Sequence, residues 1–250
     1  MPSLLPLNRR FGMLVLAALS PCVVHAQLVN GAFDSGLSGW STLGDASIQA
    51  GAPQGANQLW LTTASALFQD DFPAAAGARN RSGTTTAAAG GAGGVEDFTG
   101  VPLGGLDPNP ASGVYAYEGS AARQVFTAAS GSTLSFAWDM GTSDHVYDDL
   151  AFVVVDGVVT RLATSTQAVA LGTLDNTWRT GFSTASFTLS GSGAHSLSFG
   201  VVDIGDFSAT STLAIAGVQL GGVSAVPESP GALLGLASLA MLGVRFGRRR

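Results

Sequence analysis

Apolar and polar residues alternate over short stretches in the middle of the chain, the pattern of strands with one buried face. Leu134, Phe136 and Trp138 are separated by small or polar residues, so we expect these three side chains in the core. Two apolar runs, 150–155 and 158–163, flank Asp156-Gly157, a dipeptide that favours the two-residue turn of a hairpin. We also expect strands at 27–33, 58–62, 114–117, 124–127, 187–189, 197–201 and 213–220.

These stretches predict an all-β fold, because no helical period longer than two turns occurs between residues 27 and 225. About ten short strands in one domain indicate a two-sheet antiparallel, jelly-roll-like sandwich over residues 27–225. Residues 73–110 break the pattern and consist mostly of Ala, Gly, Thr and Pro, with the run AAAGGAGG at 87–94. We interpret about 73–110 as a flexible loop inserted in this domain; a domain boundary is the alternative.

The first 26 residues predict a signal helix that directs export. Arg9 and Arg10 precede an apolar run at 11–24, which is too short for a membrane span and ends at small residues. We therefore expect signal peptidase to cleave between Ala26 and Gln27. Cys22 leaves a lipoprotein as the alternative.

The end of the chain combines a short motif, an apolar stretch and a basic terminus. Residues 231–246 predict a helix of about 24 Å, which arginine side chains can extend toward the membrane surface. By the positive-inside rule the arginines stay in the cytoplasm, which tethers the exported protein to the inner membrane. These arginines are Arg245, Arg248, Arg249 and Arg250, and the motif before the helix is Val226, Pro227, Glu228 and Ser229.

This arrangement over residues 226–250 resembles the PEP-CTERM sorting tail of exported bacterial proteins. The resemblance implies recognition by exosortase, a membrane transpeptidase that removes the tail and passes the protein to the cell envelope or extracellular matrix. Ser229 departs from the second proline of the usual Pro-Glu-Pro motif, and the next proline is Pro230. Whether this variant is processed therefore stays open.

Charge narrows the possible partners of residues 27–225. This region holds five arginines, no lysine and sixteen carboxylates, a net charge of −11. A nucleic-acid-binding protein needs a basic face, so nucleic acid is excluded as a partner. One cysteine in the whole chain excludes a disulfide framework and a cysteine-rich zinc site.

The start of this region, LVNGAFD at 28–34 followed by Gly39-Trp40, resembles the first strand of jelly-roll carbohydrate-binding modules and galactose-binding-like domains. The resemblance implies polysaccharide binding, and it implies that Asp34 helps to hold a structural calcium ion. The usual aspartate of the last strand is absent here, because 214–218 reads AIAGV. A second calcium candidate is the acidic stretch with Asp144, Asp148 and Asp149, for which turn formation is the alternative.

Three tryptophans, Trp40, Trp60 and Trp178, are candidates for stacking on sugar rings, with burial in the core as the alternative. His195 lies in a strand in which apolar and polar residues alternate, and we expect it on the solvated face. The chain lacks the protease, esterase and nucleotide-binding motifs. We therefore expect a non-enzymatic, exported binding or structural module whose ligand is an exopolysaccharide. A glycan hydrolase or lyase and a purely structural matrix protein are the alternatives.

Overall fold

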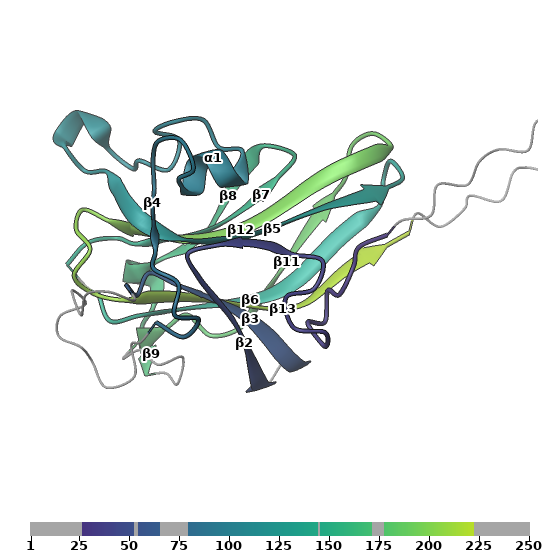
Figure 1. Cartoon of the computed structure of the whole chain (residues 1–250), viewed down its shortest axis with the longest axis horizontal. Coiled ribbons are helices and arrows are strands. Elements are labelled where there is room, and N and C mark those ends of the chain that lie inside the picture. The colour runs from purple at the N-terminus through teal and green to yellow at the C-terminus, as the bar shows by residue number, and fades with distance from the viewer. Residues whose placement is uncertain (1–26, 53–54, 66–79, 145, 172–177, 223–250) are drawn as a thin grey trace, which may run out of the picture.

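The computed structural model describes residues 27–52, 55–65, 80–144, 146–171 and 178–222. They form two antiparallel sheets packed face to face, which confirms the predicted all-β, two-sheet sandwich (Figure 1). The first sheet has the order β1(Ser41–Leu43), β5(Ala116–Ala128), β12(Gly193–Ile204), β7(Leu150–Val155), β8(Val158–Thr164), with β4(Ala87–Ala88) also paired to β5. The second has the order β2(Asp45–Ala52), β3(Gly55–Thr62), β13(Ser211–Gly221), β6(Thr133–Thr142), β10(Trp178–Arg179), β9(Ala170–Leu171), with β11(Ser183–Thr188) also paired to β6.

The core lies between the inner faces of the two sheets. On β6 the predicted alternation holds, because Leu134 and Phe136 are buried and Trp138 packs against the core while partly exposed. Full burial of such a side chain contributes roughly 1.5–3 kcal/mol, so these positions determine which face of each strand points inward. Core residues from other elements include Phe33, Trp40, Leu59, Leu61, Phe199, Leu213 and Ile215.

The Ala/Gly-rich segment is not one long loop where the structure describes it. From Asn80 onward it contains β4, the helix α1(Val95–Thr99) and the 3-10 turn Pro110–Ser112. Val95, Val101 and Leu106 are buried against the outer face of the first sheet, in a cluster that includes Phe152, Val154, Val202 and Ile204. The expectation of a flexible loop at about 73–110 is therefore corrected for residues 80–110, and residues 73–79 lie outside the described part.

Buried Glu96 ties this segment together from within. Its two carboxylate oxygens accept hydrogen bonds from the backbone N–H groups of Gly104 and Leu106, each at 2.9 Å. Gly94 precedes the helix at a point where a Cβ atom would lie 2.6 Å from the carbonyl oxygen of Ala88, so only glycine fits. The outer face of the first sheet is thus covered, whereas no described helix lies on the outer face of the second (Figure 1).

The hairpin at Asp156-Gly157 forms as predicted. Both residues have positive φ angles, 51° and 78°, and they join β7 to β8. Other strand boundaries differ from expectation. Residues 114–117 span the start of one long strand, β5, and residues 124–127 lie within the same strand. Residues 27–33 form turns apart from one bridge, Gln27 to Thr127, while β1 and β2 were not expected.

Both described ends of the chain lie at the same end of the sandwich, which we call the base (Figure 1). Gln27 pairs with Thr127, and the N–H of Val218 donates to the carbonyl oxygen of Gly31 at 2.9 Å. The opposite end, the tip, holds the connections from β6 to β7 and from β12 to β13, which are joined by a hydrogen bond from Ser143 N–H to the Thr210 carbonyl at 3.0 Å.

Within the described residues, no helix has both the length and the apolar character needed to cross a membrane. The expected signal helix (1–26) and the expected membrane helix (231–246) both lie outside the described residues.

Candidate functional site

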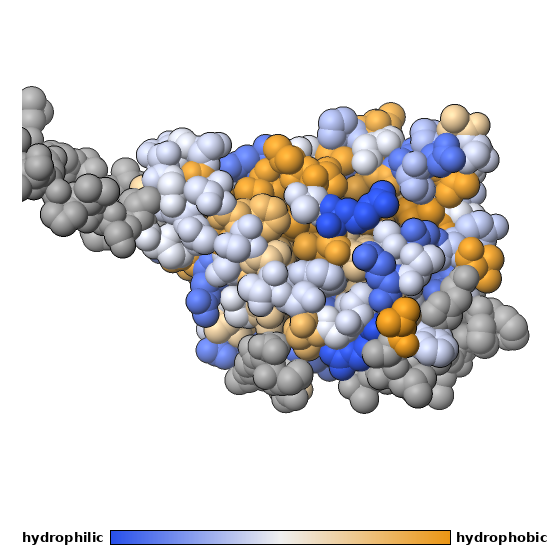
Figure 2. Space-filling view, turned by 180° about the vertical axis from the view of Figure 1, so that it is seen from behind, coloured by the Kyte–Doolittle hydropathy of each residue, from blue (hydrophilic) through white to orange (hydrophobic). Residues whose placement is uncertain are grey.

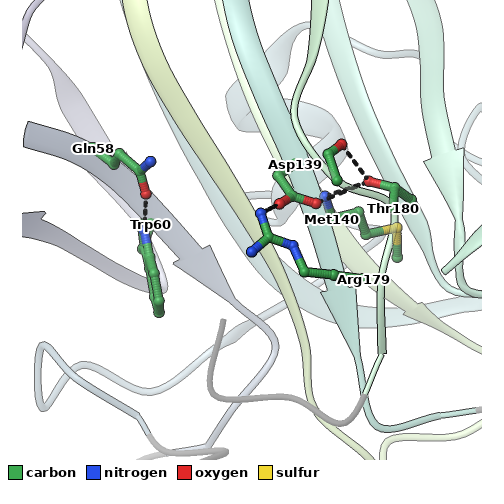
Figure 3. Close-up of polar contacts among 7 residues, drawn as sticks. Gln58, Trp60, Asp139, Met140, Arg179 and Thr180 are labelled. Atoms are coloured by element: carbon green, nitrogen blue, oxygen red, sulfur yellow. Dashed lines mark hydrogen bonds and ion pairs between the residues drawn. The ribbon is translucent and has the colours of Figure 1, made fainter. Parts of the chain in front are cut away.

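The outer face of the second sheet is the candidate site, since it brings polar and aromatic side chains of several strands together (Figure 3). Strand alternation positions them: Leu59 and Leu61 of β3 point into the core, so Gln58 and Trp60 point outward. On β6, Asp139 points outward, opposite to its core-facing neighbour Met140. Ala214 of β13 pairs with both Trp60 and Asp139, so these three residues form one row across the sheet.

Trp60 is held in a fixed orientation on this face. Its indole N–H donates to Oε1 of Gln58 at 2.8 Å, and its ring packs with Ala214 and with Phe182. The guanidinium of Arg81 lies over the ring, 4.9 Å from the centroid. Only 8% of Trp60 is exposed, so it forms a buried wall of the face rather than an open stacking platform.

Asp45 explains why Arg81 lies over this ring. The carboxylate of Asp45 is fully buried and accepts hydrogen bonds from the backbone N–H of Arg81 at 3.1 Å and of Ser82 at 2.7 Å. The hydroxyl of Thr62 donates to the same carboxylate at 2.5 Å. These bonds fix the backbone of residues 81–82 beside β2 and β3.

Asp139 and Arg179 form an ion pair on the other side of the row. Nη2 of Arg179 donates to Oδ2 of the fully buried Asp139, and the hydroxyl of Thr180 donates to Oδ1 at 3.0 Å. The same hydroxyl accepts the N–H of Met140 at 3.0 Å, so β6 and the chain after β10 are locked together (Figure 3). Burial lowers the pKa of the Arg179 guanidinium from its ordinary value, which still leaves it charged in neutral solution.

Next to this row lies a depression of about 200 Å³, which we call the trough. Its floor is made of small residues because Ala137 of β6 pairs with Ala216 of β13, and Gly217 follows. Gly217 has a φ angle of 58° and lies in the irregular stretch where the register of β13 against β6 shifts. The rim carries groups that form hydrogen bonds without charge, those of Ser135, Thr184 and Gln219.

The chemistry of the trough is that of a binding surface for an uncharged, hydroxyl-rich molecule. None of the described residues that line it is ionisable. The nearest carboxylate along β6, that of Asp139, is neutralised by Arg179. A pair of carboxylates facing each other, as glycoside hydrolysis requires, does not occur among the lining residues.

A second depression, of about 240 Å³, lies beside α1 and is lined by Gly91, Ala92, Glu96, Asp97, Val101 and Leu103. The carboxylate of Glu96 is occupied by backbone N–H groups, and Oδ2 of Asp97 accepts the N–H of Gly93 at 2.8 Å. Its polar groups therefore serve the fold of this segment.

The three candidate tryptophans have different roles. Trp40 belongs to the core, with 7% exposure and ring contacts to Phe33 at 5.5 Å and Phe199 at 5.8 Å, so it cannot stack on a ligand. Trp60 lies at the candidate site. Trp178 of β10 is half-buried and alternates with the outward-facing Arg179, which places it on the opposite side of the sheet.

The predicted calcium ligands do not come together. Asp34 is exposed near the base and accepts a hydrogen bond from Asn57 at 2.9 Å. At the tip, Asp144 accepts the N–H of Val146 at 2.6 Å, and Asp148 accepts the N–H and hydroxyl of Thr166. Among the described residues there is no group of three His, Cys, Asp or Glu side chains that could hold a metal ion.

Asp149 shows how hydrogen bonds from distant segments occupy a carboxylate at the tip. Its oxygens accept the N–H of Ile204 at 3.0 Å and the hydroxyl of Ser211 at 2.5 Å. Burial raises the pKa of this carboxyl to about 7, with smaller upward contributions from Asp144 and Asp206. The turn alternative fits Asp144, which accepts the N–H of Val146 two residues on, whereas Asp148 and Asp149 accept hydrogen bonds from distant segments.

Other predicted residues fall outside the described part, namely Ala26, the motif Val226 to Ser229, and the four terminal arginines. Sequence reasoning did not identify Gln58, Arg179 or the floor of the trough as parts of a site. The alternation on β6 contained a usable signal, because its outward positions 135 and 137 carry only Ser and Ala.

No protein-family model matches the chain, and no curated protein matches it. Among solved structures, TmCBM61 in complex with β-1,4-galactotriose aligns with 78% of this chain and 97% of its own, at 12% identity and a TM-score of 0.39. A structure described as CBM4 aligns with 75% of this chain and 97% of its own, at 12% identity and a TM-score of 0.36. The enzymatically active domain of tailspike protein 4 of bacteriophage CBA120 aligns with 78% of this chain and 21% of its own, at 13% identity and a TM-score of 0.36. Likeness of this extent assigns the chain to no family.

Proposed function

We propose that the protein is an exported, non-catalytic module that binds an extracellular polysaccharide in the trough on the outer face of its second sheet. The observation that carries the proposal is the floor of Ala137, Ala216 and Gly217, bordered by uncharged hydrogen-bonding groups and open to a volume of about 200 Å³. A sugar ring has a flat face of C–H groups and an edge of hydroxyls, which matches an apolar floor and a polar rim.

The charge of the molecule restricts the polysaccharide. With a net charge of −11 over residues 27–225, the protein repels acidic polymers. The lining of the trough adds no ionisable group that would attract a charged sugar. We therefore propose a neutral sugar unit as the occupant of the trough.

A blocking substitution tests this site. Thr184 and Thr188 both lie on the exposed outer side of β11, opposite Ala137 and Thr133, but only Thr184 lines the trough. Thr184→Trp should fill the trough, whereas Thr188→Trp places the same ring about 13 Å further along the strand. The two variants therefore form a matched pair.

The assay is binding to an array of neutral and acidic glycans, followed by calorimetry on the best ligand. We expect the wild-type protein and Thr188→Trp to bind a neutral glycan and Thr184→Trp to lose at least about tenfold in affinity, or about 1.4 kcal/mol. Equal binding by all three proteins would refute the trough as the site. Release of reducing sugar from the bound glycan would refute the non-catalytic role.

The proposal for export rests on the sequence of the two ends and needs a separate test. Mass spectrometry of the protein isolated from its native cells should show an N-terminus at Gln27 and a C-terminus close to the motif at 226–229. The trough lies toward the base, because Gln219, one of its lining residues, is only three residues from Gly222, where the described part of the chain ends. Intact protein dissolved inside the cell would contradict this part of the proposal.

A further inference from the structure

The tip of the sandwich carries an exposed aromatic surface that the trough does not use. All three tyrosines of the chain are here, Tyr115, Tyr117 and Tyr147, together with Phe207. Their exposed fractions are 44%, 42%, 38% and 49% in that order, which is unusual for aromatic side chains in a chain whose other large rings are mostly buried or half-buried. We call these four residues the tip cluster.

The four rings come from three separate segments, and the hydroxyl of Tyr115 donates to the carbonyl oxygen of Pro110 at 3.4 Å. The N–H of Gly205 donates to the carbonyl oxygen of Tyr115 at 2.9 Å. The ring of Tyr147 lies against Gly205 so closely that a Cβ atom there would be 2.3 Å from its Cδ1. The rings of Tyr117 and Phe207 are in edge contact, with centroids 6.1 Å apart. The cluster is therefore a built surface rather than a chance scatter of exposed residues.

The same segments are strongly anionic. Among the described residues of 106–118, 143–149 and 203–209 there is no arginine or lysine. Of the seven carboxylates in these segments, Asp107, Glu118, Asp148 and Asp206 are partly exposed, whereas Asp144, Asp149 and Asp203 are buried and add no charge to the surface itself. Asp107 and Asp206 are pinned beside the cluster, since they accept the N–H groups of Ala116 and Ser208 at 2.9 and 3.0 Å.

Exposed aromatic faces surrounded by carboxylates complement a cation that also has apolar surface. A ring face attracts an ammonium group through its quadrupole, and carboxylates nearby add to that attraction. A neutral sugar gains no attraction between opposite charges from the carboxylates, and an anionic lipid surface or acidic glycan is repelled by them. The surface therefore fits a positively charged ligand with C–H groups beside its charge.

We propose that the tip cluster binds an amino-sugar polymer with free, protonated amino groups. The ammonium groups lie against the rings and the carboxylates, and the C–H faces of the sugars pack on Tyr117 and Phe207. The inference rests on the proposed glycan-binding function and adds a second ligand class at a second place. Both described ends of the chain lie at the base, and the tip is the opposite end of the sandwich (Figure 1).

The experiment compares two ligands with the same sugar backbone: a glucosamine oligomer, and the same oligomer with every amino group acetylated, which removes the positive charges and adds an acetyl group at each. Binding is measured by calorimetry in mildly acidic buffer, where the amine is protonated, at low and at high salt. We expect the free amine to bind, the acetylated oligomer to bind at least about tenfold more weakly, and added salt to weaken binding. Equal affinity for both oligomers would overturn the proposal.

Variants locate the ligand on the protein. The double variant Tyr117→Leu/Phe207→Leu keeps apolar bulk without rings and should reduce affinity for the free amine about tenfold. Asp206→Asn keeps an oxygen for the N–H of Ser208 but removes the charge, so it should also weaken binding and reduce the salt dependence. Val158→Ala, an exposed apolar position at the base, is the control and should change nothing.

Three further outcomes separate this site from its alternatives. Thr184→Trp should lose neutral-glycan binding but keep amine binding, because this substitution changes only the trough. Equal affinity for an oligolysine peptide would mean that the surface recognises charge without recognising sugar, and this would overturn the assignment to an amino-sugar polymer. Unchanged affinity in the double variant would exclude the tip cluster itself. Circular dichroism of each variant confirms that the fold is retained.

Discussion

Replacement of Asp149 by asparagine should remove a large part of the pH dependence of stability. Asp149 is 1% exposed, and burial raises the pKa of its carboxyl to about 7 in the folded protein. In the unfolded chain the same carboxyl titrates near its ordinary pKa of about 3.9. The folded state therefore retains a proton that the unfolded state releases, and the free energy of unfolding falls as the pH rises between about 4 and 7.

The magnitude follows from the difference between the two pKa values. Three units at about 1.36 kcal/mol each give at most about 4 kcal/mol lost between pH 4 and pH 8. The asparagine variant stays neutral throughout, and its amide can take over the contacts. Its oxygen accepts the N–H of Ile204, and its NH₂ donates to Ser211, whose hydroxyl lies 2.8 Å from that of Thr142. In the wild-type protein at low pH, the protonated Oδ2 of Asp149 donates to the hydroxyl of Ser211 in the same way.

Urea denaturation at several pH values measures the effect as the difference between variant and wild type, in which other titrating groups cancel. We expect little difference near pH 4 and a variant that is more stable by up to about 4 kcal/mol near pH 8. Asp148→Asn, next in sequence but partly exposed, is the control and should show no such divergence. A variant-minus-wild-type difference that is the same at every pH would refute a raised pKa at Asp149.

Three other substitutions or treatments follow from the structure. Trp40→Ala should cost about 3–5 kcal/mol in urea denaturation, because it empties core space beside Phe33 and Phe199, yet leave glycan affinity unchanged in the folded protein. Arg179→Met should cost about 3–5 kcal/mol by leaving the carboxylate of Asp139 buried without its cation, and adding Asp139→Asn should restore part of this loss. The melting temperature should be the same with calcium and with chelator; a calcium-dependent rise would restore the metal assignment at the tip.

Local patterns were sufficient where the cause of the structure is itself local. The alternation on β6 and the Asp156-Gly157 turn were predicted because side-chain period and turn conformation are set by neighbouring residues. The covering segment at 80–110 was missed because its few apolar residues bury their surface against strands far along the chain. The low content of apolar residues in this segment therefore concealed its ordered structure.

The candidate site was harder to predict, since its contacts join positions about 40 residues apart. Asp139 and Arg179 give no sign in sequence that they form a pair, and neither shows that it faces the same side as Trp60. His195 is a similar case: expected on the solvated face, it is 5% exposed, because its Nδ1 lies 2.7 Å from Asp156 and its ring stacks on Phe126. Polar residues become buried when a distant partner compensates for the lost water.

The segment over the first sheet also determines how the protein behaves when it is damaged. Beneath α1 lies a nearly continuous apolar sheet surface, with Phe152, Val154, Val202 and Ile204. Seen from behind, the molecule shows apolar and hydrophilic side chains interspersed, as expected for a surface that meets water (Figure 2). Proteolytic cleavage or detachment of residues 87–106 would expose a flat, apolar sheet surface. Aggregation of otherwise folded molecules would then begin at this surface, before the sandwich itself unfolds.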